Sequence, residues 1–411
     1  METFLVGGAV RDKLLNIPIK DEDWVVVGAR PKDLLALGYK QVGKGFPVFL
    51  HPDSKQEYAL ARTERKQGTG HTGFDIDSSE HVSLEEDLLR RDLTINAMAQ
   101  TETGEIIDPF NGQRDLDRKL LKHVSDAFSE DPLRVLRVAR FAARFSHLGF
   151  RIAPETLELM HNMVQSGELE SLVAERIWQE TELALASATP REYIAVLREC
   201  EALKIILPEV NALFGVPQIS KYHPEIDTGV HTLMCLEEVV KLSDDIAVRY
   251  ATLVHDVGKA ATDQSKWPSH SGHEALGIAL QDQIARRLRI PNEHNQLAAL
   301  VCKHHTELLR VQQMQPIALL NFLESLDAFR RPERLEKFLL VCEADARGIT
   351  GCEDRKYPQR NYLNAVLAAT RDLNFANLLA EKGKGNAAEA VKNKRLQLVT
   401  DKVAELRASN D

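Results

Sequence analysis

Two carboxylates near the start of the chain, Asp21 and Asp23, stand directly before the apolar run Trp24 to Val27. In an extended segment successive side chains point to opposite faces, so Asp21 and Asp23 are expected to project to one side. Two such carboxylates can share Mg²⁺, and a pair of these ions can clamp the attacking and leaving oxygens of a phosphoryl displacement. The spacing therefore indicates a magnesium site, against the plainer alternative of a solvated charge cluster before a strand.

A glycine pair, Gly7-Gly8, lies just upstream and is followed by Arg11. Paired glycines let backbone N–H groups approach phosphate oxygens closely, and an arginine adds a charge-assisted hydrogen bond. The stretch fits neither Gly-x-x-x-x-Gly-Lys nor Gly-x-Gly-x-x-Gly, so a P-loop or a dinucleotide-binding fold finds no support. Alone the pair is typical of a turn, but beside two carboxylates it favours a phosphate site.

A capping box, Ser83-Leu84-Glu85-Glu86, predicts a helix that carries Arg90, Arg91, Asp92 and Asn96. Asp92 and Asn96 are four residues apart and would face one side of that helix, where they could read a hydroxyl group. The alternative is a surface helix with a local hydrogen bond.

A second predicted helix begins near Asp131 and Pro132, which suit its N-cap and its first turn. Four arginines recur along it at helical spacing, within about a third of its circumference. They are Arg134, Arg137, Arg140 and Arg144. This face is expected to attract anions.

Histidines and carboxylates gather again between Thr228 and Arg347. The group comprises His231, His255-Asp256-Val257-Gly258-Lys259, His270, His273, Glu274, His304, His305 and Asp345. A single histidine on a helix is usually a packing or surface residue, but the clustering favours a site. Imidazole and carboxylate together suit a borderline divalent transition metal, and an adjacent His-Asp pair can supply two ligands from one helical turn.

The elements that must position these residues change character along the chain. Up to about Asn111, short β-rich runs alternate with glycine, proline and polar residues, which predicts strands over 24–27, 47–50, 57–61 and 105–107. From Asp131 onward the apolar spacing is helical, and a Pro- and Gly-interrupted stretch from Leu207 to Pro224 divides that part. The expected fold class is α+β, with a mixed N-terminal sheet followed by all-helical domains.

Length, net charge and cysteine content exclude several classes of protein. The 411 residues suffice for two or three domains, and the net charge of -9 argues against a protein that coats nucleic acid by bulk electrostatics. The five cysteines are scattered, so neither a disulfide framework nor a zinc knot is indicated. No apolar run approaches the roughly 20 residues that span a bilayer. We expect a soluble, cytoplasmic protein with no membrane partner.

Six motifs in order resemble those of the class II CCA-adding enzymes, tRNA nucleotidyltransferases of the polymerase-beta superfamily. The motifs are Gly7-Gly-Ala-Val-Arg-Asp12, Asp21-x-Asp23, Arg90-Arg-Asp-Leu-Thr-Ile-Asn-Ala-Met-Ala99, Asp108-Pro-Phe-Asn-Gly112, Glu130-Asp-Pro-x-Arg134 and Ala174-Glu-Arg-Ile-Trp-Gln-Glu180. Asn111 departs from the family, which often has a second glycine there. The resemblance implies a polymerase-beta-like head over 1–130 and a helical neck and body over 131–206.

The same resemblance implies a role for each head residue. Asp21 and Asp23 would hold catalytic Mg²⁺, and Gly8, Arg11, Arg91, Arg137 and Arg140 would hold the incoming CTP or ATP. Asp92 and Asn96 would sense the ribose, and Asp131 and Arg134 would read the base. Glu57 is a candidate third carboxylate. The partner implied is tRNA, bound by its acceptor arm and 3′ end.

The histidine-rich segment resembles the HD phosphohydrolase superfamily, which is all-helical. The resemblance implies an HD domain over 228–350, a helical tail over 351–411, and His231, His255, Asp256 and Asp345 as metal ligands. His273, His304 and His305 are candidates for a second metal or for facing phosphate. Some bacterial CCA-adding enzymes carry such a domain, with phosphatase, 2′-nucleotidase and 2′,3′-cyclic phosphodiesterase activity supported by Ni²⁺ or another transition metal.

Two other interpretations stay open. A bacterial poly(A) polymerase shares the head motifs but would add only A; the HD segment and the lack of a long basic C-terminal extension speak against it. A non-catalytic RNA-binding regulator would have a degenerate head, and the intact Asp21 and Asp23 speak against that. The expected oligomeric state is a monomer or a homodimer.

Overall fold

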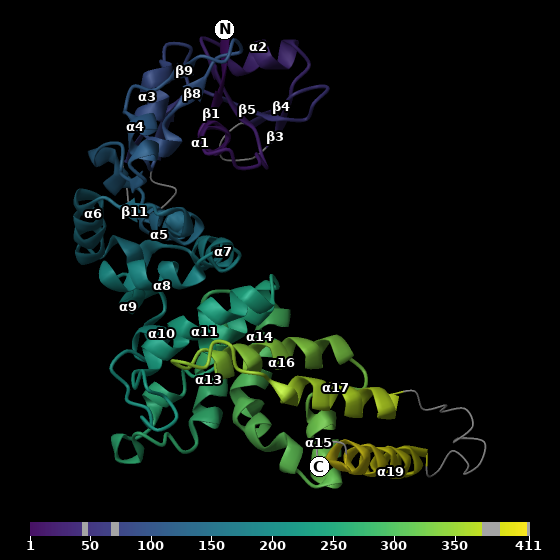
Figure 1. The fold of residues 1–411 in the computed structure, drawn as a ribbon. Helices are drawn as coiled ribbons and strands as arrows, with labels where there is room; N and C mark the ends of the chain where they lie inside the picture. The colour runs from purple at the N-terminus through teal and green to yellow at the C-terminus, as the bar shows by residue number, and fades with distance from the viewer. Residues whose placement is uncertain (43–47, 67–73, 372–386, 409–411) are drawn as a thin grey trace. The chain divides into compact units, whose positions relative to one another are not determined.

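A computed structural model gives the fold, drawn in Figure 1. It describes residues 1–42, 48–66, 74–371 and 387–408. The chain divides into two compact units, Met1–Ile206 and Leu207–Asp411. Among the described helices, none combines the length and the apolar character needed to cross a membrane.

The first unit is built on a seven-stranded mixed sheet in the order β3-β4-β5-β2-β1-β8-β9. Its strands are β1 (Glu2–Val6), β2 (Asp23–Val27), β3 (Lys40–Val42), β4 (Val48–Leu50), β5 (Glu57–Leu60), β8 (Ala99–Gln100) and β9 (Ile106–Ile107). β2 and β5 run parallel, and the other neighbours run antiparallel. The four predicted strands are confirmed with ends shifted by about one residue, and Pro47 lies outside the described residues. β1, a central strand, was missed.

Alternation along β2 divides the core of this sheet between its two faces. Val25 packs with Phe4 of β1 and Leu88 of α3 (Leu84–Leu89), whereas Val26 packs with Leu34 of α2 (Pro31–Ala36). Successive side chains of a strand point to opposite faces, so Asp23 shares the face of Val25. The start of β2 therefore presents Asp23 beside Val6, its register partner at the end of β1.

Helices complete the first unit. α1 (Gly8–Leu14) follows β1 directly, and α4 (Gly112–Asp117) follows β9. Beyond the sheet come α5 (Leu133–Phe145), α6 (Pro154–Gln165), α7 (Ala174–Leu185), α8 (Pro190–Glu199) and α9 (Leu203–Ile206), and α5 packs against α7 and α8. Two small strand pairs stand apart from the main sheet: β6 (Thr63–Lys66) with β7 (Phe74–Asp77), and β10 (Leu120–Leu121) with β11 (Arg151–Ile152). β11 interrupts the region expected to be entirely helical, and two residues are too few to show a strand pattern.

Over its described residues the second unit is helical. Its α-helices are α10 (Pro208–Asn211), α11 (Thr228–Leu242), α12 (Ile246–Val254), α13 (His273–Arg287), α14 (Asn292–His304), α15 (Pro316–Ser325), α16 (Pro332–Arg347), α17 (Pro358–Arg371) and α19 (Ala387–Ala408), and a 3-10 helix spans His305–Gln313. α11, α12, α14 and α16 pack together as its core (Figure 1). The α+β prediction is confirmed, while the finer division into four domains stays a prediction.

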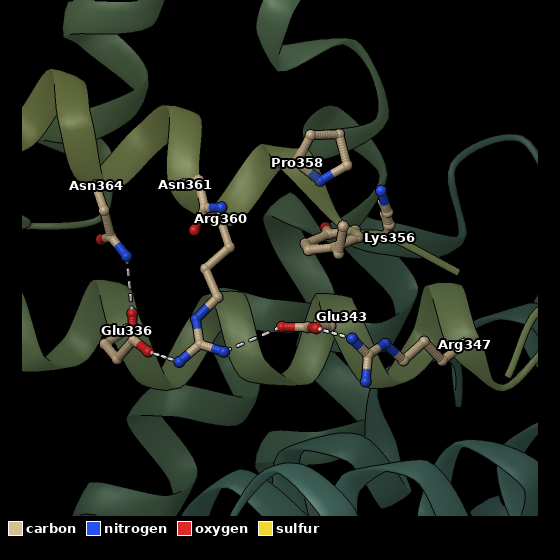
Figure 2. A pocket seen from close by; sticks show the side chains of 9 residues that line it. Glu336, Glu343, Arg347, Lys356, Pro358, Arg360, Asn361 and Asn364 are labelled. Atoms are coloured by element: carbon tan, nitrogen blue, oxygen red, sulfur yellow. Dashed lines mark hydrogen bonds and ion pairs between the residues drawn. The ribbon is translucent and has the colours of Figure 1, made fainter. Parts of the chain in front are cut away.

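Ion pairs tie α17 to α16 along a surface pocket (Figure 2). The Arg360 guanidinium contacts Glu336 and, at 3.2 Å, Glu343. Arg347 Nη2 lies 2.6 Å from the same Glu343 carboxylate. Because Glu343 stands two residues before Asp345, this chain of charges braces the helix that carries a predicted metal ligand.

Candidate active sites

A cavity of about 690 Å³ in the first unit gathers the head residues singled out by sequence. Its lining comprises Gly7, Gly8, Arg11, Asp12, Lys20, Asp21, Asp23, Arg62, Arg90, Arg91, Asp92, Asn96, Asp131, Leu133, Arg134, Arg137, Arg140, Phe141, Arg144, Arg176 and Leu183. Basic side chains outnumber acidic ones in this lining, which creates a field that attracts a polyanion such as a nucleoside triphosphate.

Asp21 and Asp23 both line the cavity, although only Asp23 belongs to β2. Burial raises the pKa of Asp23, and the nearby Asp21 carboxylate raises it further, while Arg91 opposes both effects. Two carboxylates that disfavour each other's charge in a partly buried place are stabilised by a divalent cation. The pair therefore fits Mg²⁺.

Glu57 is the register partner of Asp23 across the parallel pair β2–β5. Residues in register point to the same face of a sheet, so Glu57 is well placed to stand beside Asp23. It is exposed, and the cavity lining described above does not include it. Its role as a third carboxylate stays a prediction.

Gly7 makes the turn from β1 into α1 with a φ of 66°. Its N–H donates to the Met98 carbonyl at 3.1 Å, and a Cβ at this position would lie 2.7 Å from Arg91 Nη1. Both the backbone angle and the close approach require glycine. The turn thereby brings Arg91 against the backbone beside Gly8.

We expect Gly7→Ala to displace Arg91 and to raise the KM for the nucleotide at least tenfold, because the added methyl group occupies the place of the guanidinium. Backbone strain alone costs about 1–3 kcal/mol, so the control must carry the same strain. Gly167→Ala provides it, since Gly167 has a φ of 78° and nothing within 4 Å of its Cβ position. Steady-state kinetics and melting curves of both variants check this; an equal loss in both would attribute the effect to strain.

Arg11 is almost fully buried, with 2% of its surface exposed. Its Nε donates to Asp12 at 2.8 Å, its Nη1 contacts the Asn96 side chain, and its guanidinium lies 5.0 Å from the centre of the Phe145 ring. Burial lowers the pKa of Arg11 to about 10, which leaves it charged at neutral pH. Arg11 is thus held rigidly at the cavity wall.

The helix predicted to carry Asp92 and Asn96 ends earlier. The capping box at Ser83 is confirmed, but α3 stops at Leu89 and a 3-10 turn spans Thr94–Asn96. The Asp92 carboxylate accepts the N–H of Leu93 at 2.8 Å, a local bond that competes with helix continuation. Asn96 Nδ2 nevertheless donates to Asp92 Oδ1 at 2.9 Å, so the two side chains meet without a shared helix.

Three arginines of α5 are each held by an acidic side chain at the cavity. Arg137 pairs with Asp92 at 2.7 Å, Arg140 with Glu180 at 2.5 Å and Arg144 with Asp12 at 2.7 Å. Burial disfavours the charge of Asp92, but Arg137 and the hydrogen bonds from Asn96 and Leu93 hold its pKa well below the usual range. No local pattern predicts these partners, because each lies far along the chain from its arginine.

The side chains of Asp131 and Arg134 are each held by groups elsewhere in the unit. Asp131 Oδ1 accepts the N–H of Leu133 at 3.0 Å and Oδ2 lies 3.0 Å from Arg176 Nη2, while α5 begins two residues after Asp131. Arg134 donates to the backbone carbonyls of Ala127 at 2.7 Å and Arg90 at 2.5 Å. Arg176 belongs to the sixth motif, to which sequence reasoning assigned no role.

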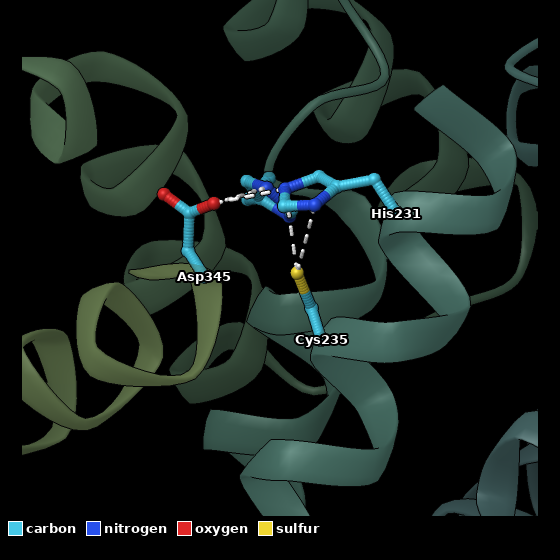
Figure 3. A group of neighbouring side chains, drawn as sticks. His231, Cys235 and Asp345 are labelled. Carbon is cyan, nitrogen blue, oxygen red and sulfur yellow. Dashed lines mark hydrogen bonds and ion pairs between the residues drawn. The ribbon is translucent and has the colours of Figure 1, made fainter. Parts of the chain in front are cut away.

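The second unit brings together most of the predicted HD residues. His231 of α11 lies with Nε2 at 3.0 Å from Asp345 Oδ1 of α16 (Figure 3). His255 Nε2 lies 3.6 Å from the same oxygen. Asp256 lies between His255 at 3.3 Å and the pair His273 and His305, at 3.6 and 3.4 Å. Residues from α11, α16 and the end of α12 therefore converge with those from α13 and from the 3-10 helix that begins at His305.

Backbone carbonyls set the orientation of four histidine rings in the cluster. Four imidazoles place Nδ1 within hydrogen-bonding distance of a backbone carbonyl, which can only accept, so Nδ1 carries a proton and Nε2 is the nitrogen left to face the cluster. The pairs are His231 with Gly348 at 3.0 Å, His255 with Thr252 at 2.8 Å, His273 with His270 at 3.0 Å and His305 with Val301 at 2.9 Å.

Each Nε2 faces a carboxylate oxygen across the cluster. Within the described part of the chain, the buried atoms His255 Nε2 and Asp256 Oδ1 have no hydrogen-bond partner. Burial disfavours the charges of His255 and Asp345, but Asp256 and Asp345 hold the pKa of His255 well above the usual range, and His231 and His255 hold the pKa of Asp345 well below it. A divalent metal would take the place of the Nε2 protons, and the imidazoles with the ionised carboxylates would then supply the donor set of a borderline divalent metal, so the residues fit one.

His304 is the exception among the predicted HD residues. Its Nδ1 lies 2.8 Å from Glu307, and its ring meets Phe322 edge-on. Successive residues at a helix end point about 100° apart, so His305 reaches the cluster and His304 turns away from it.

Gly258 allows the cluster to close. A Cβ there would lie 2.0 Å from the His273 carbonyl and 2.5 Å from the N–H nitrogen of Gly277. Only glycine lets the chain after Asp256 pass so close to α13. Lys259, next along, contacts Asp256 at 2.6 Å and donates to Gln218 at 2.6 Å.

Comparison with known families covers most of the chain. Residues 3–122 match the model of the Poly A polymerase head domain, residues 149–214 that of a probable RNA and SrmB-binding site of polymerase A, and residues 228–344 that of the HD domain. Two solved structures share the fold. They are a Thermotoga maritima CCA-adding enzyme complexed with tRNA (19% identity, TM-score 0.61, 100% of this chain and 92% of that one) and a Bacillus stearothermophilus CCA-adding enzyme in complex with CTP (22% identity, TM-score 0.63, 99% and 93%).

Two curated relatives are much closer in sequence. The Multifunctional CCA protein of Hahella chejuensis (strain KCTC 2396) is 54% identical over 97% of this chain and 95% of its own length. That of Thioalkalivibrio sulfidiphilus (strain HL-EbGR7) is 54% identical over 98% of this chain and 99% of its own. With a polymerase head, an HD domain and this identity along almost its whole length, the chain belongs to the family of multifunctional CCA proteins.

Proposed function

We propose that the first unit adds and repairs the 3′-terminal CCA of tRNA, using CTP and ATP without a nucleic-acid template. The observation that carries this proposal is the single cavity in which paired carboxylates face a wall of fixed arginines. Family membership supports it, and so do the solved relatives described as binding tRNA and CTP. Mg²⁺ held by Asp21 and Asp23 would neutralise charge on the attacking and leaving oxygens in a two-metal nucleotidyl transfer.

The chain's own residues bind and orient the triphosphate. Arg91, set against the backbone by Gly7, and Arg11, held by Asp12 and Asn96, supply charge-assisted hydrogen bonds to phosphate oxygens. Arg137 and Arg140 are positioned by Asp92 and Glu180, so their guanidinium groups need little reordering when an anion arrives. Asp92 and Asn96 lie side by side to meet the ribose.

The base would be read by Asp131 and Arg134. Cytosine and adenine each show an amine donor beside a ring-nitrogen acceptor, whereas uracil and guanine show a carbonyl beside a ring N–H. A carboxylate accepts from the amine, and a guanidinium donates to the ring nitrogen. The bond from Leu133 N–H to Asp131 fixes the carboxylate at the start of α5, where it also lines the cavity.

Asp131→Ala is expected to lower kcat/KM for CTP and ATP relative to UTP and GTP by roughly tenfold or more, because a wrongly paired polar group is costly in a buried site. Asp131→Asn is the matched variant, since asparagine keeps the cap on Leu133 but presents an amide to the base. Kinetics with all four nucleotides check this. Unchanged ratios with a lowered melting temperature in Asp131→Ala alone would reduce Asp131 to a helix cap.

We infer for the second unit a metal-dependent phosphohydrolase, with phosphatase, 2′-nucleotidase and 2′,3′-cyclic phosphodiesterase activity. His231, His255, Asp256 and Asp345 would hold Ni²⁺ or another transition metal, with His273 and His305 beside a second position. Such a metal supplies Lewis-acid activation of water at neutral pH. Lys259 places a positive charge beside Asp256, where it can orient a phosphate group.

Incubation with tRNA lacking its CCA end tests the two activities together. Labelled CTP and ATP should both be incorporated, in the order C, C, A, whereas a poly(A) polymerase would incorporate only ATP and a regulator neither. A tRNA that ends in a 2′,3′-cyclic phosphate should become a substrate for addition only after the HD site has acted.

A further inference from the structure

One cysteine, Cys235, lies among the proposed HD ligands, although no sequence motif singled it out. Cys235 lies on α11 one helical turn after His231, so both side chains point from the same face of the helix. Its Sγ lies 3.4 Å from His231 Nε2, and neither residue has measurable exposure. Figure 3 shows the Cys235 sulfur beside the His231 ring.

The donor atoms around this sulfur form a compact set. One ligand atom from each of His231, Cys235, His255 and Asp345 lies within 4.8 Å of the others, a spacing that one ion can bridge. A second observation points to a ligand here: the buried His255 Nε2 faces the set and has no hydrogen-bond partner. Two imidazoles, one thiolate and one carboxylate are nitrogen, sulfur and oxygen donors that a borderline transition metal accepts.

We propose that Cys235 is a metal ligand, which adds a sulfur donor to the nitrogen and oxygen donors of His231, His255, Asp256 and Asp345. The inference rests on the proposed HD metal site and concerns which donors complete it. The thiol releases its proton to solvent as the sulfur–metal bond forms. A soft sulfur donor selects Co²⁺, Ni²⁺, Zn²⁺ or Cd²⁺ over Mn²⁺ and Mg²⁺, which oxygen donors serve better.

The competing explanation is packing. Gly348 leaves no room for a side chain above Cys235, since a Cβ there would lie 2.5 Å from Sγ, and a buried cysteine can simply fill such a space. Packing predicts that any small residue serves as well as cysteine. Metal ligation predicts a signal that depends on sulfur.

Titration of the full-length protein with Co²⁺ separates these explanations. We expect a sulfur-to-Co²⁺ charge-transfer band in the near ultraviolet in the unmodified chain and in Cys342→Ser, which alters another buried cysteine on α16. Cys235→Ser should lose this band, bind Co²⁺ and Cd²⁺ at least roughly tenfold more weakly, and leave Mn²⁺ binding little changed. Melting curves of the metal-free proteins show whether each variant is folded.

The possible outcomes separate a failure of the Cys235 proposal from a failure of the proposed metal site. Stoichiometric Co²⁺ binding without the sulfur band in the unmodified chain would overturn the role of Cys235 and leave the metal site standing. No Co²⁺ binding to the folded, unmodified chain would overturn the proposed metal site itself. Equal Co²⁺ affinity in Cys235→Ser and the unmodified chain would establish packing as the role of Cys235.

Discussion

Asp23→Asn should reduce CCA addition by roughly three orders of magnitude or more, and Asp21→Asn should do the same. An amide carries no charge, so it cannot replace a carboxylate that holds Mg²⁺, and the several kcal/mol of charge stabilisation supplied by the metal are lost. The arginine wall remains intact in both variants. We therefore expect tRNA binding within about a factor of two of the unmodified protein.

Single-turnover incorporation of labelled CTP, with tRNA binding measured in parallel, checks this expectation. Asp53→Asn is a suitable control because Asp53 is exposed in the same unit and this substitution changes the charge by the same amount. Near-normal addition by Asp21→Asn or Asp23→Asn would remove that residue from the metal site. Loss of activity in Asp53→Asn as well would mean that overall charge, and not a metal ligand, is responsible.

His255→Ala and Asp256→Asn should abolish hydrolysis of 2′,3′-cyclic phosphates and leave CCA addition unchanged. Both residues are about 1% exposed and lie at the centre of the HD cluster, whereas Asp21 and Asp23 belong to the other compact unit. Removing one donor from the proposed site weakens metal binding and leaves the remaining donors without a cation. The loss should appear both in hydrolysis and in bound metal per chain.

His304→Ala is the matched control, because His304 is the neighbouring histidine that turns away from the cluster. Metal content and hydrolysis should survive this change. If they fell as in His255→Ala, the cluster would have to include His304. If instead His255→Ala impaired CCA addition in a protein with a normal melting curve, the two activities could not be independent.

Local signals in the sequence predicted local structure well. Four residues sufficed for the capping box at Ser83, and a short β-rich apolar run sufficed for β2. The continuation of that helix to Asn96 was wrong, because α3 already ends at Leu89 and the Asp92 side chain beyond it accepts the N–H of Leu93 in a local bond. β1 was missed, although it joins β2 to β8 in the sheet.

The side chains that hold the arginines and carboxylates of the head cavity in place could not be predicted from the sequence. The pairs are Asp12 with Arg144, Glu180 with Arg140 and Arg176 with Asp131. The members of each pair are far apart in the sequence and meet only after the chain has folded. Motif positions identified which residues gather in the head cavity, but the spacing did not reveal that the α5 arginines are already paired. Cys235 carried no signal because one cysteine at helical spacing from a histidine is ordinary in a packed helix.

The backbone bonds of the HD imidazoles bear on how this site withstands mutation. Thr252, His270 and Val301 serve through their carbonyl oxygens, which every amino acid carries, whereas the fourth carbonyl belongs to Gly348, where a side chain would collide with Cys235. The backbone of the helices therefore sets the direction in which each Nε2 points. Changing the side chain at Thr252, His270 or Val301 keeps the acceptor, while an inserted or deleted residue in α11, α12 or α14 would rotate its histidine out of reach.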